Sequence, residues 1–268
     1  MGFEGKVVIV TGAASGLGAQ IARSFAQQRA TVELLDRDGP AAAATAAGIA
    51  GGITRARVVD VRDHAGVSTV LEAIRAERGR LDVLVNCAGI REIAGALELT
   101  PEEWQRVIDV NLGGAFNCAQ AAARIMATAG RGSIVNVSST SGLSADPSRV
   151  AYCASKAGIL GLTRSLAMDL GRHGVRVNAV CPGLVRTPLT ESYFADQDFV
   201  AGLEQVVPLG RAADPRDIAD VVLFLAGDGA RHVSGVALPV DGGFLAGKSW
   251  ETAAGSAFSA PSSTPVSD

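Results

Sequence analysis

The 268-residue sequence has few aromatic residues (4%) and few charged residues (19%), and it contains only three histidines and four cysteines. The net charge of −3 argues against a basic surface for nucleic acid or for an anionic membrane. No histidine has a metal-ligand spacing to another or to a cysteine, so we predict no metal site. No two cysteines form a CxxC pair, which favours reduced cysteines and a cytoplasmic protein.

Long hydrophobic runs are also missing. A membrane-spanning helix needs about 20 strongly apolar residues. The charge-free stretch 39–54 is only 16 residues long, and alanine and glycine dominate it. Hydrophobic residues nevertheless make up 48% of the chain, which is enough for a buried core. We therefore expect a soluble globular protein with neither a membrane nor a nucleic acid as partner.

Short runs rich in valine and isoleucine alternate with longer alanine-rich segments along most of the chain. Most of these runs are almost continuously apolar, which is typical of parallel strands covered on both faces. Predicted strands are 6–11, 31–36, 55–60, 82–86, 132–137, 175–180 and 235–240. Predicted helices are 16–28, 41–50, 67–78, 101–129 with a break near 111–114, 151–173 and 215–226. This order predicts one doubly wound α/β domain over residues 1–248.

The end of the chain has a different composition. Residues 255–268 are rich in serine, proline and alanine and show no apolar periodicity. We therefore expect residues 249–268 to form a mobile tail outside the domain.

The first predicted strand ends in a glycine-rich turn that leads directly into a helix. Residues 11–18 read TGAASGLG, and glycines let backbone N–H groups approach a phosphate closely. The first helical turn adds unpaired N–H donors and the positive end of the helix dipole. An ordinary strand-to-helix turn is the alternative, but the context favours a dinucleotide site. We predict that Gly12, Ser15, Gly16, Leu17 and Gly18 form it.

The residue that ends the second strand indicates which dinucleotide binds. Asp36 follows Gly18 by 18 residues, and a carboxylate there can accept hydrogen bonds from ribose hydroxyls while repelling a 2′-phosphate. Arg37 is the opposing feature, because an arginine can bind that phosphate. We therefore expect NAD as the cofactor, with Asp36 and Arg37 in contact with it and NADP as the alternative.

A YxxxK motif, Tyr152 to Lys156, lies on a predicted helix, so the phenol and the ammonium group share one helix face. A nearby ammonium and an oxidised nicotinamide would favour the phenolate. Lowering the Tyr152 pKa by roughly 2 units requires about 3 kcal/mol of such stabilisation. Ser139 follows the fifth strand, 13 residues before Tyr152.

Together these motifs resemble the short-chain dehydrogenase/reductase family. The GxxxGxG turn, Asn86-Cys87-Ala88-Gly89 in place of NNAG, Asn111, Ser139, YxxxK and the PGxVxT segment 182–187 occur in the family's order, over roughly residues 4–245. Cys87 departs from the second asparagine of the pattern. The resemblance implies a single-domain Rossmann-type fold, with a seven-stranded parallel sheet flanked by helices, and a homotetramer.

The resemblance also implies roles for the reacting residues. Tyr152 would exchange a proton with a secondary alcohol or ketone while hydride passes to or from the nicotinamide. Ser139, rather than Ser138, would fix the substrate oxygen. Lys156 would lower the Tyr152 pKa and bind the nicotinamide ribose, and Asn111 would hold a water of the proton relay. Further cofactor contacts implied are Asp60, Val61, Asn86, Ala88, Gly89, Tyr152, Pro182, Gly183, Val185 and Thr187.

The substrate region is less informative. Residues 187–210 are expected to form a lid, and they contain four acidic residues and no basic one. An acidic, aromatic lid favours an uncharged alcohol or ketone, although acids that simply face water are an equal alternative. Arg91 and Glu92 are expected to border the pocket, where Arg91 could hold a substrate carboxylate; a surface arginine without such a role is the commoner alternative. Three further residues are expected to line it: Leu143, Ser144 and Val150.

Two other functions stay open. A 3-oxoacyl-(acyl-carrier-protein) reductase would prefer NADPH and need a basic docking patch, for which Arg131 and Arg172 are candidates. A catalytically silent nucleotide-binding regulator could share the fold, but such relatives usually lose the tyrosine or the lysine.

Small residues recur on the two helices that carry Asn111 and Tyr152. They would permit close helix packing, either between subunits or within the chain. These residues are Ala119, Ala122, Ala123, Gly158 and Gly161.

Overall fold

The computed structural model describes residues 2–247, so the predicted tail 249–268 lies outside the described part of the chain. Seven strands form one parallel sheet in the order β3-β2-β1-β4-β5-β6-β7. This confirms the predicted fold class. The strands are β1 (Val7–Thr11), β2 (Thr31–Asp36), β3 (Ile53–Val58), β4 (Val83–Asn86), β5 (Gly132–Val137), β6 (Val175–Pro182) and β7 (Ala237–Val240).

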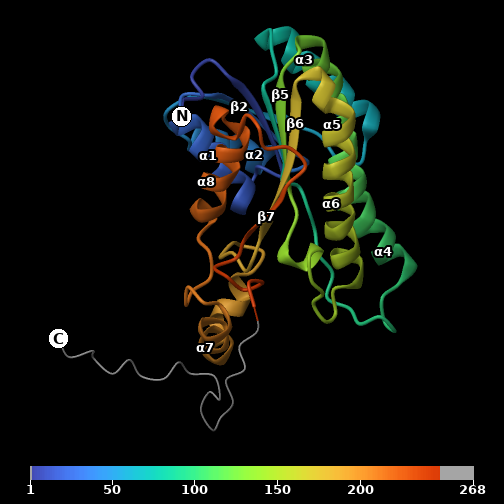
Figure 1. Cartoon of the computed structure of the whole chain (residues 1–268), viewed down its shortest axis with the longest axis vertical. Helices are drawn as coiled ribbons and strands as arrows, with labels where there is room; N and C mark the ends of the chain where they lie inside the picture. The colour runs from blue at the N-terminus through green and yellow to red at the C-terminus, as the bar shows by residue number, and fades with distance from the viewer. Residues whose placement is uncertain (1, 248–268) are drawn as a thin grey trace, which may run out of the picture.

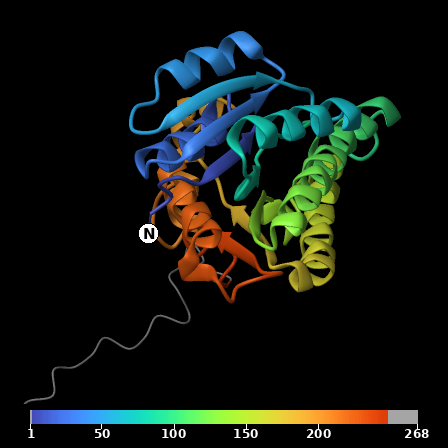
Figure 2. The same cartoon turned by 90° about the horizontal axis from the view of Figure 1, so that it is seen from above.

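Helices cover both faces of the sheet (Figures 1 and 2). The first layer contains α1 (Gly16–Gln27), α2 (Gly39–Ala47) and α8 (Pro215–Ala226). The second contains α3 (His64–Arg78), α5 (Gly114–Ala129) and α6 (Val150–Leu170), with α4 (Pro101–Ile108) preceding α5. A π-helical turn, η1 (Asp109–Gly113), joins α4 to α5 at the predicted break. The short η4 (Glu191–Ala195) and α7 (Gln197–Val206) lie in the predicted lid.

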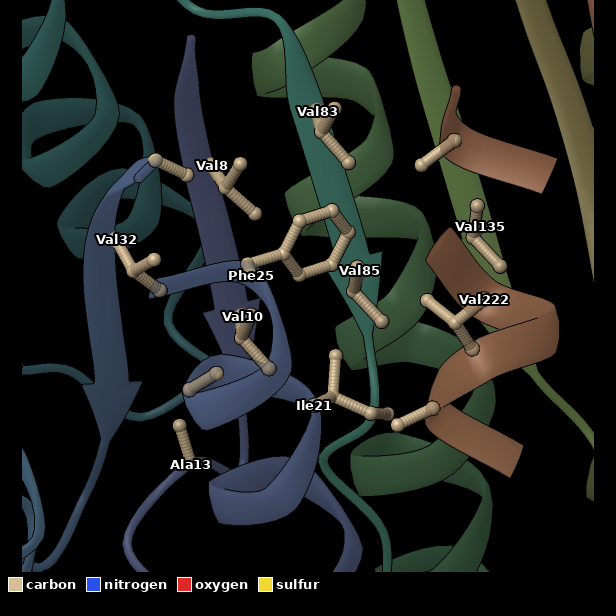
Figure 3. Close-up of a cluster of buried hydrophobic side chains, with 14 of the residues drawn as sticks. Val8, Val10, Ala13, Ile21, Phe25, Val32, Val83, Val85, Val135 and Val222 are labelled. Carbon is tan, nitrogen blue, oxygen red and sulfur yellow. The ribbon is translucent and has the colours of Figure 1, made fainter. Parts of the chain in front are cut away.

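The apolar runs form strands because each strand serves two hydrophobic cores. Successive side chains of β1 point to opposite faces. Val8 and Val10 join one cluster with Ile21 and Phe25 of α1 (Figure 3), while Val7 and Ile9 belong to the cluster on the other face. A strand with two buried faces has no need for alternating polarity, which explains the continuous runs.

The predicted element boundaries are wrong where polar side chains bind the backbone. β3 ends at Val58 rather than at residue 60, because its neighbour β2 ends at the paired residue Asp36, and the Asp60 carboxylate then accepts a hydrogen bond from the Arg62 N–H in the turn that follows. Helices α2 and α3 begin earlier than predicted. Asp38 and Asp63 precede them and cap their first turns.

The small residues of α5 and α6 mostly pack within the chain. Ala119, Ala122 and Ala123 are buried in the core between α5 and the sheet. A Cβ at Gly158 would lie 2.8 Å from the Leu112 side chain of η1. Only Gly161 of this group is exposed and has open space beside it. Close packing within the chain therefore accounts for four of the five.

The strand order reverses direction between β1 and β4, which places the first βα turn beside the loop after β4. Ligands of open α/β sheets bind at such a point, beyond the carboxyl ends of the strands. Gly12 has a φ of +66°, and a Cβ there would lie 2.7 Å from the Cα of Ala88. Within residues 2–247, no helix combines the length and apolarity needed to cross a membrane.

Candidate active site

A cavity of about 1300 Å³ follows the carboxyl ends of the strands from the glycine turn to Tyr152. It brings together nearly all the residues predicted to bind the cofactor. The lining includes Gly12, Ser15, Gly16, Leu17, Gly18, Asp36, Arg37, Asp60, Val61, Ala88, Gly89, Tyr152, Lys156, Pro182, Gly183, Val185 and Thr187.

The glycine turn leaves the N-terminus of α1 open toward this cavity. Ser15 stands at the N-cap with extended backbone, and its side chain caps no N–H group. A side chain at Gly18 would collide with the Gly12 carbonyl, so the turn can be this tight only with glycine. Uncapped N–H donors at a helix N-terminus fit a diphosphate.

Asp36 is held at the opposite side of the turn. Its Oδ2 accepts a hydrogen bond of 3.0 Å from the Ala14 N–H, and its Oδ1 accepts one of 3.0 Å from the Asp38 N–H. These bonds fix a carboxylate at the cavity wall, where it can accept hydrogen bonds from a ribose. The residues present therefore fit an adenine dinucleotide.

Asp60 and Asn86 have partners within the protein. Asp60 lines the cavity, and the Arg62 guanidinium hydrogen-bonded to it lowers the pKa of its carboxyl. Asn86 does not line the cavity. Its Nδ2 donates to the carbonyl of Ala115 and to Oδ1 of Asn136, so its side chain connects β4 to α5 and β5.

Tyr152, Ser139 and Lys156 converge at the other end of the cavity. The Lys156 Nζ lies 5.5 Å from the centre of the Tyr152 ring and donates to the Val137 carbonyl at 2.9 Å. The Ser139 hydroxyl is close enough to the Tyr152 phenol to lower its pKa, and it donates to the Ser141 hydroxyl at 3.1 Å. Ser138 instead donates to the Lys156 carbonyl at 2.8 Å, which ties α6 to the end of β5. The two adjacent serines therefore have different partners.

The protein's own groups raise the pKa of Tyr152, whereas the expected depression also includes the charge of an oxidised nicotinamide. Burial raises the pKa of Tyr152 above its usual value of 10, against the opposing effects of the Ser139 hydrogen bond and the Arg91 charge. Asp146 raises it further. Burial also lowers the pKa of Lys156 to about 8. Desolvation dominates because both side chains lie deep in the protein.

Asn111 occupies the π-helical turn and is almost completely buried. Its Oδ1 accepts from the Ile90 N–H at 2.8 Å, and its Nδ2 donates to the Ile90 carbonyl and to the Ser155 hydroxyl. It does not line the cavity. Its side chain joins the loop after β4 to α6, beside Lys156.

Several site residues were not found from the sequence. Arg149 lines the cavity and donates to the Tyr193 hydroxyl at 2.6 Å. Ser139 donates to Ser141, whose hydroxyl in turn donates to the Asp146 carboxylate at the cavity wall. These residues match no spacing pattern that we used, so only the folded loops reveal them.

The acidic side chains of the predicted lid, residues 187–210, do not face the cavity. None of its four acidic residues, Glu191, Asp196, Asp198 and Glu204, lines the cavity. Glu191 pairs with Arg186, and Asp196 caps α7. The lid turns apolar and aromatic groups inward instead, including Leu189, Tyr193, Phe199 and Leu203. The four acidic residues are exposed, which matches the alternative that they face water, so they give no argument for an uncharged substrate.

The other residues predicted to border the pocket differ in where the structure places them. Arg91 lines the cavity, as expected. Glu92 is buried beside it, and its Oε1 accepts hydrogen bonds from the N–H groups of Ala151 and Tyr152 at 2.8 and 3.1 Å. Three residues expected in the lining are absent from it: Leu143, Ser144 and Val150. All three are exposed to solvent.

Comparison with known proteins identifies the family. A family model described as enoyl-(acyl carrier protein) reductase matches residues 12–245. D-threitol dehydrogenase from Mycolicibacterium smegmatis is 41% identical, and the match covers 90% of this chain and 94% of the relative. The 3-oxoacyl-(acyl-carrier-protein) reductase FabG from Thermotoga maritima is 40% identical, with 91% of this chain and 100% of that protein covered.

Solved structures agree. A short-chain type dehydrogenase/reductase from Mycobacterium marinum superposes with a TM-score of 0.85 at 34% identity, covering 92% of this chain and 98% of that one. A candidate NAD(P)-dependent gluconate 5-dehydrogenase from Beutenbergia cavernae was solved with NADP at low occupancy. It superposes with a TM-score of 0.85 at 38% identity, covering 92% of this chain and 99% of that one. The chain belongs to the short-chain dehydrogenase/reductase family of oxidoreductases.

Proposed function

We propose that this protein is an NAD-dependent dehydrogenase of secondary alcohols, or a reductase of the corresponding ketones, with Tyr152 as the acid–base group. The observation that carries this proposal is the convergence of Tyr152, Ser139 and Lys156 in the cavity that also holds the glycine turn and Asp36. A bound nicotinamide would supply the hydride acceptor or donor.

The reacting residues would divide the work. Ser139 holds the substrate oxygen, and Tyr152 removes the hydroxyl proton in oxidation or donates it in reduction. The raised pKa of Tyr152 favours its protonated form, so oxidation depends on positive charge beside the phenol. Lys156 keeps part of that charge at neutral pH, because its pKa is about 8. Asn111 links the Ile90 backbone to the Ser155 hydroxyl, next to Lys156 in the sequence.

The preference for NAD rests on Asp36. Its carboxylate is fixed by the Ala14 and Asp38 N–H groups, so it can accept from ribose hydroxyls and would repel a 2′-phosphate. Arg37 also lines the cavity and is the feature that would serve NADP. Because the Beutenbergia structure was solved with NADP, the experiment also tests NADP as the cofactor.

The test compares initial rates with NAD and NADP on a panel of secondary alcohols, and with NADH and NADPH on ketones and a 3-oxoacyl thioester. We expect the Tyr152→Phe variant to lose about 10²- to 10⁴-fold in kcat while it still binds NAD, since only the transferable proton is removed. NAD binding is measured separately by calorimetry.

Two outcomes would overturn the proposal. A more than tenfold preference for NADPH together with turnover of the thioester would favour the acyl-carrier-protein reductase, to which the Thermotoga relative lends weight. Equal background rates in wild type and Tyr152→Phe, with NAD binding intact, would favour the silent regulator.

We propose one domain over residues 1–248, a homotetramer and a cytoplasmic location. The four cysteines are free in the structure, which is compatible with a reducing compartment. Light scattering coupled to gel filtration tests the tetramer, and a monomer at micromolar concentration would contradict it.

A further inference from the structure

Two arginines, Arg91 and Arg149, border the end of the cavity where Tyr152 lies. Arg91 follows Gly89 by two residues, and a Cβ at Gly89 would lie 3.5 Å from the Lys156 Nζ. Arg149 precedes the helix that carries Tyr152. Both guanidinium groups are therefore at the reacting end, whereas Asp36, Arg37 and Asp60 mark the other end.

Neither arginine has a carboxylate partner among residues 2–247. The ion pairs of that part of the chain include neither side chain. Arg211, which also lines the cavity, differs because it pairs with Asp217 at 2.6 Å. Arg91 and Arg149 are half-buried, so their charge is only partly solvated.

Arg91 has the more available donors of the two. It stacks over the Tyr193 ring, 4.8 Å from its centre, and one N–H donates to the Leu189 carbonyl. An arginine has five N–H donors. Arg149 already uses three of its five donors, on the carbonyls of Glu92 and Ser148 and on the Tyr193 hydroxyl, whereas Arg91 uses one. Arg91 can therefore bind an anion, while Arg149 contributes charge and holds Tyr193 beside it.

In the described part of the chain, the acidic groups nearby form no ion pair with Arg91 or Arg149, although the buried Glu92 carboxylate caps the N–H groups of Ala151 and Tyr152 close to them. The lid's four acidic side chains lie outside the cavity lining. Asp146 is in the lining, but its carboxylate accepts the Ser141 hydroxyl and forms no ion pair among the described residues. Asp241 accepts from the N–H groups of Gly243 and Leu245, which fixes the loop after β7.

We propose that the substrate is a secondary alcohol, or its ketone, that carries a carboxylate, and that Arg91 binds this carboxylate. The proposal rests on the proposed oxidoreductase function and specifies its substrate class. A planar guanidinium matches a carboxylate through paired N–H donors. Tyr193 and Phe199, whose ring centres are 5.2 Å apart, supply an apolar wall for the carbon skeleton.

The competing explanation is that Arg91 only fastens the lid through Leu189 and Tyr193. The two explanations predict different selectivity. A fastener would affect every substrate equally, whereas a carboxylate site discriminates an acid from its neutral ester. The measurement therefore compares 3-hydroxybutyrate with methyl 3-hydroxybutyrate, and cis-4-hydroxycyclohexanecarboxylate with its methyl ester, with NAD and NADP.

For the wild type we expect kcat/KM at least about tenfold higher for the acids than for their esters, as for loss of one charged hydrogen-bonding partner. Arg91→Gln should lower the acid-to-ester ratio of kcat/KM by about 10- to 100-fold, on top of any change that the lost charge beside Tyr152 makes equally to both substrates. Arg91→Lys keeps the positive charge but loses the paired N–H donors of the guanidinium, so its preference for acids over esters should lie between those of the wild type and Arg91→Gln. Arg131→Gln removes an exposed arginine elsewhere and should retain the wild-type selectivity.

A binding measurement separates this proposal from the redox assignment. Cyclohexanecarboxylate and cyclohexanecarboxamide, which have no hydroxyl to oxidise, are titrated into the protein by calorimetry. Tighter binding of the acid that Arg91→Gln abolishes supports the site even if no alcohol is oxidised, and the proposed function would then fail alone. Equal binding of acid and amide, or equal losses on acid and ester in Arg91→Gln, would overturn the carboxylate site while the redox function stands.

Discussion

At the scale of single residues, the site places ionisable side chains where burial opposes their charge. Lys156 is 5% exposed, and burial lowers its pKa to about 8. Its Nζ donates to the Val137 carbonyl, and no carboxylate pairs with it among the described residues. An ammonium without a counterion is destabilising in such a position. The protein therefore retains a lysine here at a cost in stability.

This cost predicts a pH dependence of stability. Below pH 8 Lys156 is protonated in both folded and unfolded chains, so the full penalty applies. Between pH 8 and about 10.5 the unfolded chain binds more protons, and stability rises with pH. Relative to Lys156→Met, we expect the wild type to gain about 3 kcal/mol over this range. Urea unfolding of both proteins without cofactor, at pH 7, 8, 9 and 10, measures it.

The difference between the two proteins isolates Lys156 from other groups that titrate at high pH. A constant gap in unfolding free energy across the four pH values would mean that Lys156 is not desolvated as the structure indicates.

At the scale of elements, the helix that carries Tyr152 begins in an unusual way. Arg149 stands at its N-cap and makes no side-chain cap. Glu92 instead reaches from the loop after β4, and its Oε1 accepts from the N–H groups of Ala151 and Tyr152. A carboxylate at this position also interacts favourably with the helix dipole. The cap therefore fixes the backbone of Tyr152 directly.

We predict that Glu92→Ala lowers kcat by about tenfold and the unfolding free energy by about 1–3 kcal/mol, because two N–H donors lose their partner. Glu92→Gln keeps an acceptor oxygen and should recover most of the activity. The measurements are kcat and KM for wild type and both variants, together with urea unfolding.

The matched control is Glu103→Ala in the capping box of α4, a helix that carries none of the cavity-lining residues. It should lower the unfolding free energy by about 1 kcal/mol or less and leave kcat unchanged. If Glu92→Ala behaved in the same way, Glu92 would be a structural cap without influence on Tyr152.

The strands, the helices and the cofactor end of the cavity lining could be predicted well from the sequence, because they depend on local pattern. Apolar runs marked the strands, and glycines marked the first βα turn. Contacts between distant residues could not be predicted in this way. Glu92 and Ala151 are 59 positions apart. Glu33 interrupts a predicted strand, yet it is fully buried because Arg57 and Arg78 reach it at 2.9 and 2.8 Å. Such partners become neighbours only through the topology.

At the scale of the whole molecule, the cavity begins where the strand order reverses between the paired strands β1 and β4, because the connections that follow them lead to opposite sides of the sheet. The loops after these strands nevertheless touch at Gly12 and Ala88, where a Cβ on Gly12 would lie 2.7 Å from the Ala88 Cα. The Thr11 hydroxyl accepts from the Cys87 and Ala88 N–H groups at 3.0 and 3.1 Å. The backbone contact between Gly12 and Ala88 thus fixes the glycine turn, at the cofactor end of the cavity, against the loop that leads to the reacting end.

We predict that Gly12→Ala lowers the unfolding free energy by about 2–4 kcal/mol, since a left-handed φ and a backbone collision act together. The added methyl group should push the loop after β1 away from the loop after β4, and this displacement should weaken NAD binding by at least about tenfold. Urea unfolding measures the first effect and calorimetric titration of NAD the second.

Gly79→Ala separates these two causes. Gly79 has a φ of +76° at the end of α3, but nothing lies within 4 Å of the position its Cβ would take. Its substitution carries the conformational strain alone, about 1 kcal/mol, and should leave NAD affinity unchanged. Equal losses of stability in the two variants, or unchanged NAD affinity in Gly12→Ala, would show that the loops can separate freely. The contact at Ala88 would then not couple the cofactor end of the cavity to Tyr152.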